Sequence, residues 1–284
     1  MILLPKKSSE AIPAKTIILP GRNINLIYSL SYLTLLVLLP LACLILSVHH
    51  VSIAEAFQII STKRALSAFK VSFLISFFAC CIDLLLGVLI AWVLVKYQFF
   101  GKNFFNAIVD LPFAMPTAVS GIALATLYSH HGWIGKFLLK AGITVAYTPI
   151  GIWIALVFVG LPFVVRAVQP AIKALDRDME EAAASLGAKR AVILRKIIFP
   201  QLLPSMITGF TMAFARGLGE YGSVIFIAGN IPYVSEILPL LIVIELEQFD
   251  YKSATVLAVA MLFASFVLLV LFGILGNKIR KKYG

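Results

Sequence analysis

Six long apolar segments constrain this chain more than any other feature of its sequence. They lie at about residues 24–47, 68–95, 107–129, 148–168, 203–228 and 254–276. A helix that crosses a bilayer needs about 20 mostly apolar residues, because hydrocarbon offers no partner to free backbone groups. Of the 284 residues, 61% are hydrophobic and 13% are charged, whereas about 25% are charged in an ordinary soluble domain. We therefore predict an all-α polytopic membrane protein with six transmembrane helices.

The third apolar segment is the least regular, because Pro112 and Pro116 lie near its start. Proline lacks the backbone N–H that a helix interior requires. We expect a short interfacial helix over FFNAIV, residues 104–109, a break at the two prolines, and then the span proper.

The lysines and arginines predict the orientation of the spans, since cytoplasmic loops carry an excess of both. With a cytoplasmic N-terminus, that face holds 17 of them and the opposite face holds 6. We therefore predict a cytoplasmic N-terminal tail over residues 1–23, a six-span transmembrane domain over 24–276, and a basic cytoplasmic C-terminal tail over 277–284.

The net charge of +11 does not indicate nucleic acid as a partner, because the bases lie between apolar blocks and not on one solvated face with spaced aromatics. They suit a neighbouring membrane lipid surface instead. The three cysteines lie inside apolar segments, and the four histidines form two adjacent pairs. Neither pattern has the spacing of a metal site, so we expect no metal, no bound cofactor and no catalytic residue in this chain.

Residues 180–200, EEAAASLGAKRAVILRKIIFP, form a charged stretch in the longest predicted cytoplasmic loop, about 169–202. Asp178 and Glu181 have the spacing of a helix capping box. Gly187 is the residue type that most easily ends a helix in a left-handed conformation. We expect a short helix, a tight turn at Gly187, and a second short surface helix that Pro200 ends.

This stretch resembles the EAA loop of ABC-importer permeases, whose pattern is E-A-A, three residues, G, nine residues and I-x-L-P. The positions that match are Glu181, Ala182, Ala183, Gly187, Ile197 and Pro200, and Phe199 replaces the leucine of the pattern. The resemblance implies that this loop carries a coupling helix, which docks into a groove on a cytoplasmic ATPase and transmits its closure to the spans.

The resemblance covers roughly residues 65–275 and is to sulfate/thiosulfate permeases of the CysT type. It is carried by WVLVKYQFFGKNFFNAIVDLPFAMPTAVSGIAL, LPFVVRAVQPAI, FARGLGEYGSVIFIAGNIP and LEQFDYKSATVLA. It implies an importer with an ATPase dimer that binds ATP and Mg²⁺, an extracytoplasmic sulfate-binding protein and a second permease subunit. The family suggests that this subunit is a different, homologous chain, and a copy of this chain is the alternative. It also implies a location in a bacterial inner membrane or an equivalent plastid envelope.

Charged residues inside the predicted spans are candidates for function, because charges are expensive in hydrocarbon. Arg216 and Glu220 lie four residues apart in the fifth segment, so they share a helix face. They form either a mutually neutralising pair that fixes helix packing or part of an anion path to which Arg216 contributes positive potential. Asp83 suits a packing role or a protonated state, and Asp110 suits a helix cap.

A polytopic chain of this kind could be an ATP-driven transporter, an ion-coupled anion carrier or a membrane enzyme. No G-x-x-x-x-G-K-[ST] motif occurs, so an ATP-driven transporter would have to borrow its ATPase from a partner. An ion-coupled anion carrier would commonly show internal repeats, and none is visible. A membrane enzyme would need a nucleophile, base and oxyanion arrangement, which is not evident either. Molybdate or another oxyanion remains an alternative substrate.

Overall fold

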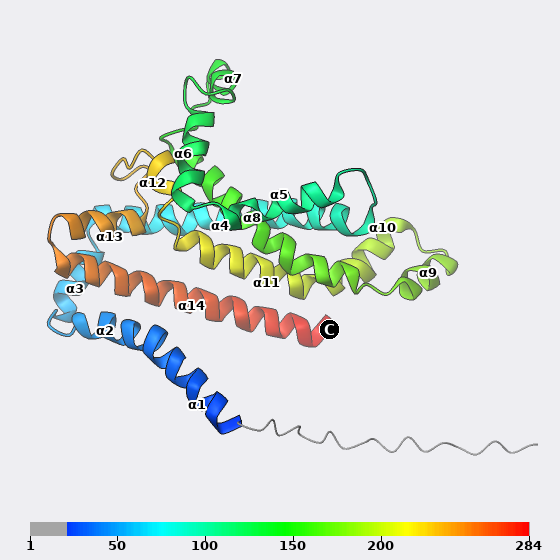
Figure 1. Cartoon of the computed structure of the whole chain (residues 1–284), viewed down its shortest axis with the longest axis horizontal. Helices are drawn as coiled ribbons and strands as arrows, with labels where there is room; N and C mark the ends of the chain where they lie inside the picture. Colours follow the sequence, from blue (N-terminus) through cyan, green and yellow to red (C-terminus); the bar gives the residue numbers. More distant parts are fainter. Residues whose placement is uncertain (1–21, 284) are drawn as a thin grey trace, which may run out of the picture. The chain divides into compact units, whose positions relative to one another are not determined.

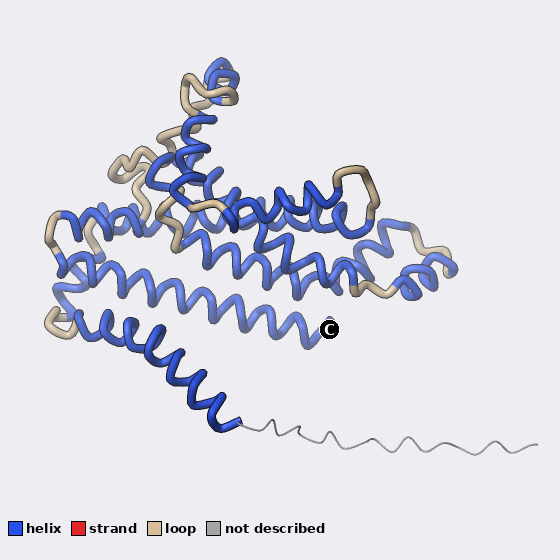
Figure 2. Tube along the Cα trace, viewed as in Figure 1, coloured by secondary structure: helices blue, strands red, loops and turns tan. Residues whose placement is uncertain are grey.

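The computed structural model describes residues 22–283, and the described part of the chain contains helices and no strand. It divides into two units, Met1–Ser47 and Val48–Gly284. The predicted N-terminal tail, 1–23, lies almost entirely outside the described residues. Figure 2 shows that helices make up most of the second unit, with loops confined to their ends.

The first unit is a helix in three consecutive parts, α1 (Arg22–Leu33), the π-helical turn η1 (Thr34–Leu38) and α2 (Leu39–Ser47). Residues Asn23–Ser47 are long and apolar enough to cross a membrane, which agrees with the first predicted span.

Two helical segments contain a π turn at the same distance before a proline. The turn η1 ends two residues before Pro40, and η2 (Leu194–Ile198) ends two residues before Pro200. The residue that follows each π turn donates its backbone N–H to the carbonyl five residues earlier, as Phe199 does to Leu194. A proline ring collides with the carbonyl four residues before it. The wider π turn relieves this collision, so the helix continues through the proline.

Pro200 therefore does not end a second surface helix, and that prediction is wrong. Instead α10 (Arg190–Ile193), η2 and α11 (Phe199–Leu218) join into one stretch, Arg190–Leu218, that is long enough to span a membrane. The fifth span begins before the predicted residue 203 and ends at Leu218 rather than at 228. The segment beyond contains only the short helix α12 (Val224–Ile227).

The core of the second unit consists of α4 (Lys63–Lys96), α8 (Pro149–Lys173) and α11, which pack against one another. Val164 of α8 is fully buried between two glycines. A Cβ added to Gly87 of α4 would lie 2.7 Å from Cγ1 of Val164, and one added to Gly209 of α11 would lie 3.0 Å from its Cα. These glycines let the three helices approach closely, as small residues do in membrane helix contacts.

The third predicted span is broken into α5 (Lys102–Ala114) and α6 (Thr117–Tyr128), and the chain bends by 111° between them. The break lies at Met115 and Pro116, as expected, whereas Pro112 lies inside α5. Met115 has an extended backbone, the conformation that a following proline favours. With 12 residues, α6 is about 18 Å long and too short to span alone, so only the bent pair provides a sixth span.

Short helices complete the second unit at its two ends. Figure 1 shows α9 (Arg177–Ser185) near the α4–α5 connection at one end, with α3 (Ile53–Ile60) and α13 (Leu238–Glu247) at the other. The helix α7 (Gly135–Lys140) follows α6, and the long α14 (Tyr251–Tyr283) returns along α11. The sequence predicted no helix for α13, although three of its leucines are buried.

Candidate functional site

The helix α9 is the first part of the candidate site, and it begins two residues earlier than predicted. Asp176, not Asp178, is the N-cap, and its side chain accepts a hydrogen bond of 2.9 Å from the Asp178 backbone N–H. The predicted capping box of Asp178 with Glu181 is therefore wrong. Both residues lie inside the helix, where Asp178 and Glu180 place negative charge in the first turn and favour the helix dipole.

Gly187 ends α9 with a φ of +82°, in the left-handed conformation that the sequence predicted. The Gly187 N–H donates to the Ala184 carbonyl at 2.9 Å, and the Ala188 N–H donates to the Ala183 carbonyl at 3.0 Å. These two hydrogen bonds make a Schellman motif. Nothing lies within 4 Å of a Cβ added at Gly187, so the backbone conformation and not crowding favours glycine here.

The six residues that match the EAA pattern lie in different surroundings. Glu181 and Ala182 are exposed, whereas Ala183 and Ile197 pack against the hydrophobic core. Pro200 is half-buried within α11. The structure therefore brings only the residues of α9 and its turn to one outer surface.

Two exposed apolar residues extend this surface and were missed in the sequence. Met179 is 49% exposed and Leu186 is 89% exposed. Together with Ala182 they follow the i, i+3, i+7 spacing of one helix face. The sequence signal for Met179 and Leu186 was an apolar residue on each side of the three alanines, in an otherwise charged loop. We call Met179, Ala182 and Leu186 the α9 face.

An ion pair joins α9 to the end of α4. The Nζ atom of Lys96 lies 3.4 Å from Oε1 of Glu180, and both side chains are partly exposed. The same ammonium group lies 5.4 Å from the centre of the Trp92 ring. Such an ion pair contributes about 0–1 kcal/mol, so it positions α9 without fixing it rigidly.

Arg216 and Glu220 form the second part of the candidate site. An Nη1 atom of Arg216 lies 2.5 Å from Oε2 of Glu220, whose side chain is 1% exposed. The other carboxylate oxygen accepts hydrogen bonds from the backbone N–H and the hydroxyl of Ser223, at 2.9 and 2.8 Å. Glu220 is therefore fully paired, although it lies just beyond the end of α11 at Leu218. The Arg216 side chain keeps 32% of its surface exposed, so a positive charge remains accessible there.

Asp83 is a buried acid of α4 whose two carboxylate oxygens have no hydrogen-bond partner. It fills space against Gly160 of α8, where an added Cβ would lie 2.1 Å from one of its oxygens. This placement agrees with the packing role that the sequence favoured.

A further polar cluster joins α5 to α8. Arg166 donates hydrogen bonds to both carboxylate oxygens of Asp110, to the side chain and backbone carbonyl of Asn106, and to Gln169. Asp110 lies inside α5 and is not a helix cap, contrary to the prediction. The i, i+4 spacing of Asn106 and Asp110 was a signal for this cluster, but its partner lies 56 residues away from Asp110.

The described residues contain no group of three or more His, Cys, Asp and Glu side chains that could hold a metal ion. The contacts described above are hydrogen bonds, ion pairs and apolar contacts. The α9 face can dock a protein surface, and Arg216 can attract an anion.

Comparison with known proteins gives a consistent result for sequence and fold. Residues 83–283 match the family described as "Binding-protein-dependent transport system inner membrane component". The chain is 42% identical over 267 residues to the "Sulfate transport system permease protein CysT" of Salmonella typhimurium, which covers 94% of this chain and 95% of that protein. It is 44% identical over 246 residues to a "Probable sulfate transport system permease protein cysT" of Chlorokybus atmophyticus, covering 87% and 85%.

Among solved structures, a chain of a bacterial ABC transporter for the import of alginate has a TM-score of 0.73 at 15% identity, covering 90% of this chain and 95% of that chain. A chain of the MetNI methionine ABC transporter has a TM-score of 0.51 at 21% identity, covering 77% and 94%. At these identities the structures establish the fold alone. The family match spans well over half of the chain, and the sulfate permease relatives extend over nearly all of it. The chain therefore belongs to the family of inner membrane components of binding-protein-dependent transport systems.

Proposed function

We propose that this chain is the permease subunit of an ATP-driven importer of sulfate, and by its resemblance also of thiosulfate. The observation that carries this proposal is the 42% identity to the sulfate transport permease of Salmonella typhimurium over 94% of the chain. Such a subunit is a transporter component and not an enzyme. The ATP and Mg²⁺ belong to a separate ATPase.

Membership of the family implies ATPase and binding-protein partners. Our finer proposal is a cytoplasmic ATPase dimer, a second and homologous permease subunit, and an extracytoplasmic sulfate-binding protein. The chain would lie in a bacterial inner membrane, with both termini in the cytoplasm. The asymmetry of the lysines and arginines supports this orientation.

The proposed ATPase contact is the α9 face, with Glu181 beside it. Three features support this assignment. Leu186 and Met179 are exposed on a helix that packs little against the rest of the chain. Exposed apolar residues rimmed by polar ones mark interaction sites. The Schellman turn at Gly187 connects α9 to α10, and the ion pair of Glu180 with Lys96 connects α9 to α4. A displacement of α9 therefore acts on two spans.

The proposed anion path passes Arg216. The Arg216 side chain is partly exposed, while its partner Glu220 is buried and already accepts two hydrogen bonds from Ser223. A dianion such as sulfate is attracted to a positive charge whose counter-charge is shielded from the path.

Uptake of labelled sulfate by cells that express the complete transporter tests the substrate. Thiosulfate and selenate should compete strongly, and molybdate should compete weakly. Stronger competition by molybdate than by thiosulfate would favour the alternative, a permease for molybdate. Concentrative uptake by the purified chain alone would favour an ion-coupled carrier and contradict the proposal.

A further inference from the structure

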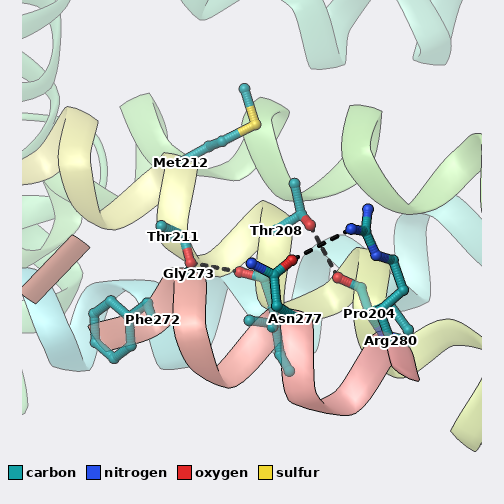
Figure 3. A pocket seen from close by; sticks show the side chains of 10 residues that line it. Pro204, Thr208, Thr211, Met212, Phe272, Gly273, Asn277 and Arg280 are labelled. Carbon is teal, nitrogen blue, oxygen red and sulfur yellow. Dashed lines mark hydrogen bonds between the residues drawn. The ribbon is translucent and has the colours of Figure 1, made fainter. Parts of the chain in front are cut away.

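A cavity of about 280 Å³ lies between α11 and α14, near the C-terminal end of α14. Figure 3 shows its lining from these two helices. The helices run in opposite directions with a constant register, so Pro204 lies at the level of Arg280 and Met212 at the level of Phe272. The cavity is therefore a groove that follows the helix axes.

The floor of the groove is open because two glycines of α14 line it. Nothing lies within 4 Å of a Cβ added at Gly273, and at Gly276 the nearest atom is Cγ2 of Ile207, at 3.4 Å. One end of the groove is apolar, with Phe272 and Met212. This end suits a hydrocarbon chain.

The other end of the groove is polar and basic. Thr208, Asn277 and Arg280 gather there, and Arg280 donates a hydrogen bond of 3.4 Å to Asn277. Arg280 is exposed, and the same end of α14 carries three further bases, Lys278, Lys281 and Lys282. The groove therefore combines an apolar half with a cationic half.

The position of the groove along α14 matches the boundary between hydrocarbon and headgroups. No charged residue occurs from Ser253 to Asn277, a stretch of about 38 Å at 1.5 Å per residue, which exceeds a hydrocarbon thickness of about 30 Å. The bases after Asn277 must therefore lie at the membrane surface, while Phe272 and Gly273 lie at the edge of the hydrocarbon. The apolar half faces acyl chains, and the basic half faces headgroups.

We propose that this groove binds one anionic phospholipid, with its phosphate at Arg280 and Asn277 and the first part of an acyl chain over Gly273 and Gly276. Juxtamembrane bases attract anionic lipids, and a guanidinium recognises phosphate by paired hydrogen bonds. The lipid would fill the space between α11 and α14, and so support the helix that carries Arg216. This site is independent of the proposed substrate.

The test uses the complete transporter in nanodiscs of phosphatidylcholine with a minority of phosphatidylglycerol. After extraction into detergent and washing, mass spectrometry measures the phosphatidylglycerol that each complex retains. We expect enrichment over the surrounding lipid for the wild type. Arg280→Gln should reduce retention about tenfold, the value of a lost hydrogen bond to a charged group. Gly273→Leu should reduce it as well, because its side chain fills the groove.

The matched control is Lys281→Gln, which removes one base from the same helix end without touching the groove. It should retain the lipid like the wild type. An equal loss in Lys281→Gln would indicate diffuse attraction to the surface and overturn the site. Displacement of the lipid by free sulfate would overturn it in favour of a free-anion site. Absence of enrichment, or a cross-link from Gly273→Cys to the second permease subunit, would mean that the groove holds no lipid. If Gly273→Leu fails to assemble, the comparison of Arg280→Gln with Lys281→Gln decides alone.

Discussion

Arg216 is the residue at which the two interpretations of the intramembrane charges differ most. As a structural partner it neutralises Glu220, and as part of a path it attracts the anion. Geometry alone agrees with both, because the pair is closed at 2.5 Å while the arginine stays partly exposed.

A pair of variants separates these roles. Arg216→Gln should reduce sulfate uptake to background while the transporter still assembles, because Ser223 continues to donate to Glu220. The double variant Arg216→Gln with Glu220→Gln leaves no unpaired buried charge. We expect it to assemble and to remain inactive in uptake of labelled sulfate. Recovery of uptake in the double variant would show that Arg216 serves only to neutralise Glu220.

Residue-scale predictions from the sequence succeeded where the cause is local. The left-handed Gly187 followed from the intrinsic preference of glycine, and the proximity of Arg216 to Glu220 followed from their spacing. They failed where the partner is distant in sequence. The partner of Asp110 is Arg166, and a single sequence does not reveal a contact between helices that are not adjacent in the chain.

At the scale of the elements, the three core helices depend on the close approach around Val164. Gly87→Ala should destabilise the purified transporter by about 1–3 kcal/mol, because an added methyl group forces a stiff β-branched side chain out of place. The midpoint of thermal unfolding measures the effect.

Two comparisons control this experiment. Gly273→Ala, in a helix with open space around its Cβ, should not lower the midpoint, because alanine favours a helix more than glycine does. In the double variant with Gly87→Ala, Val164→Ala should remove most of the loss of stability that Gly87→Ala causes alone, because it removes the Val164 methyl groups that the new Cβ would meet. If the losses of stability of the two single variants add in the double variant, the contact between Gly87 and Val164 is refuted.

The turn between α9 and α10 gives a second prediction. Gly187→Val should abolish ATP-driven uptake, because a left-handed conformation costs about 1–2 kcal/mol for a residue with a Cβ and the Schellman turn would open. Gly187→Asn should keep most of the activity, since asparagine tolerates this conformation. Uptake and ATPase activity are measured in parallel. Normal uptake by the valine variant would show that the turn between α9 and α10 only connects the two helices.

The sequence predicted the elements unequally well. Long apolar runs located the spans to within a few residues at 23–47, 63–96 and 251–281, because the bilayer thickness dictates their length. Prolines were harder to interpret. Pro116 breaks a helix, Pro112 lies within one, and Pro200 is accommodated by a π turn. Only the surrounding packing distinguishes these outcomes, so the end of α5 and the start of α11 were misplaced.

At the scale of the whole chain, one helical stretch of the second unit connects the proposed coupling surface to the proposed path. The segment from Arg190 to Leu218 starts beside the α9 turn and ends at the Arg216 pair. A displacement of α9 therefore has a continuous helix along which to act on Arg216. The proposed ATP-driven transport depends on this connection between α9 and Arg216.

The most direct test reconstitutes the complete transporter in liposomes, with the sulfate-binding protein on the side opposite α9 and ATP on the side of α9. The proposed ATP-driven mechanism predicts concentrative uptake of labelled sulfate that requires both ATP and the ATPase subunits, and that stops when a variant ATPase cannot hydrolyse ATP. Uptake that continues without the ATPase, driven by a proton or sodium gradient, would contradict it.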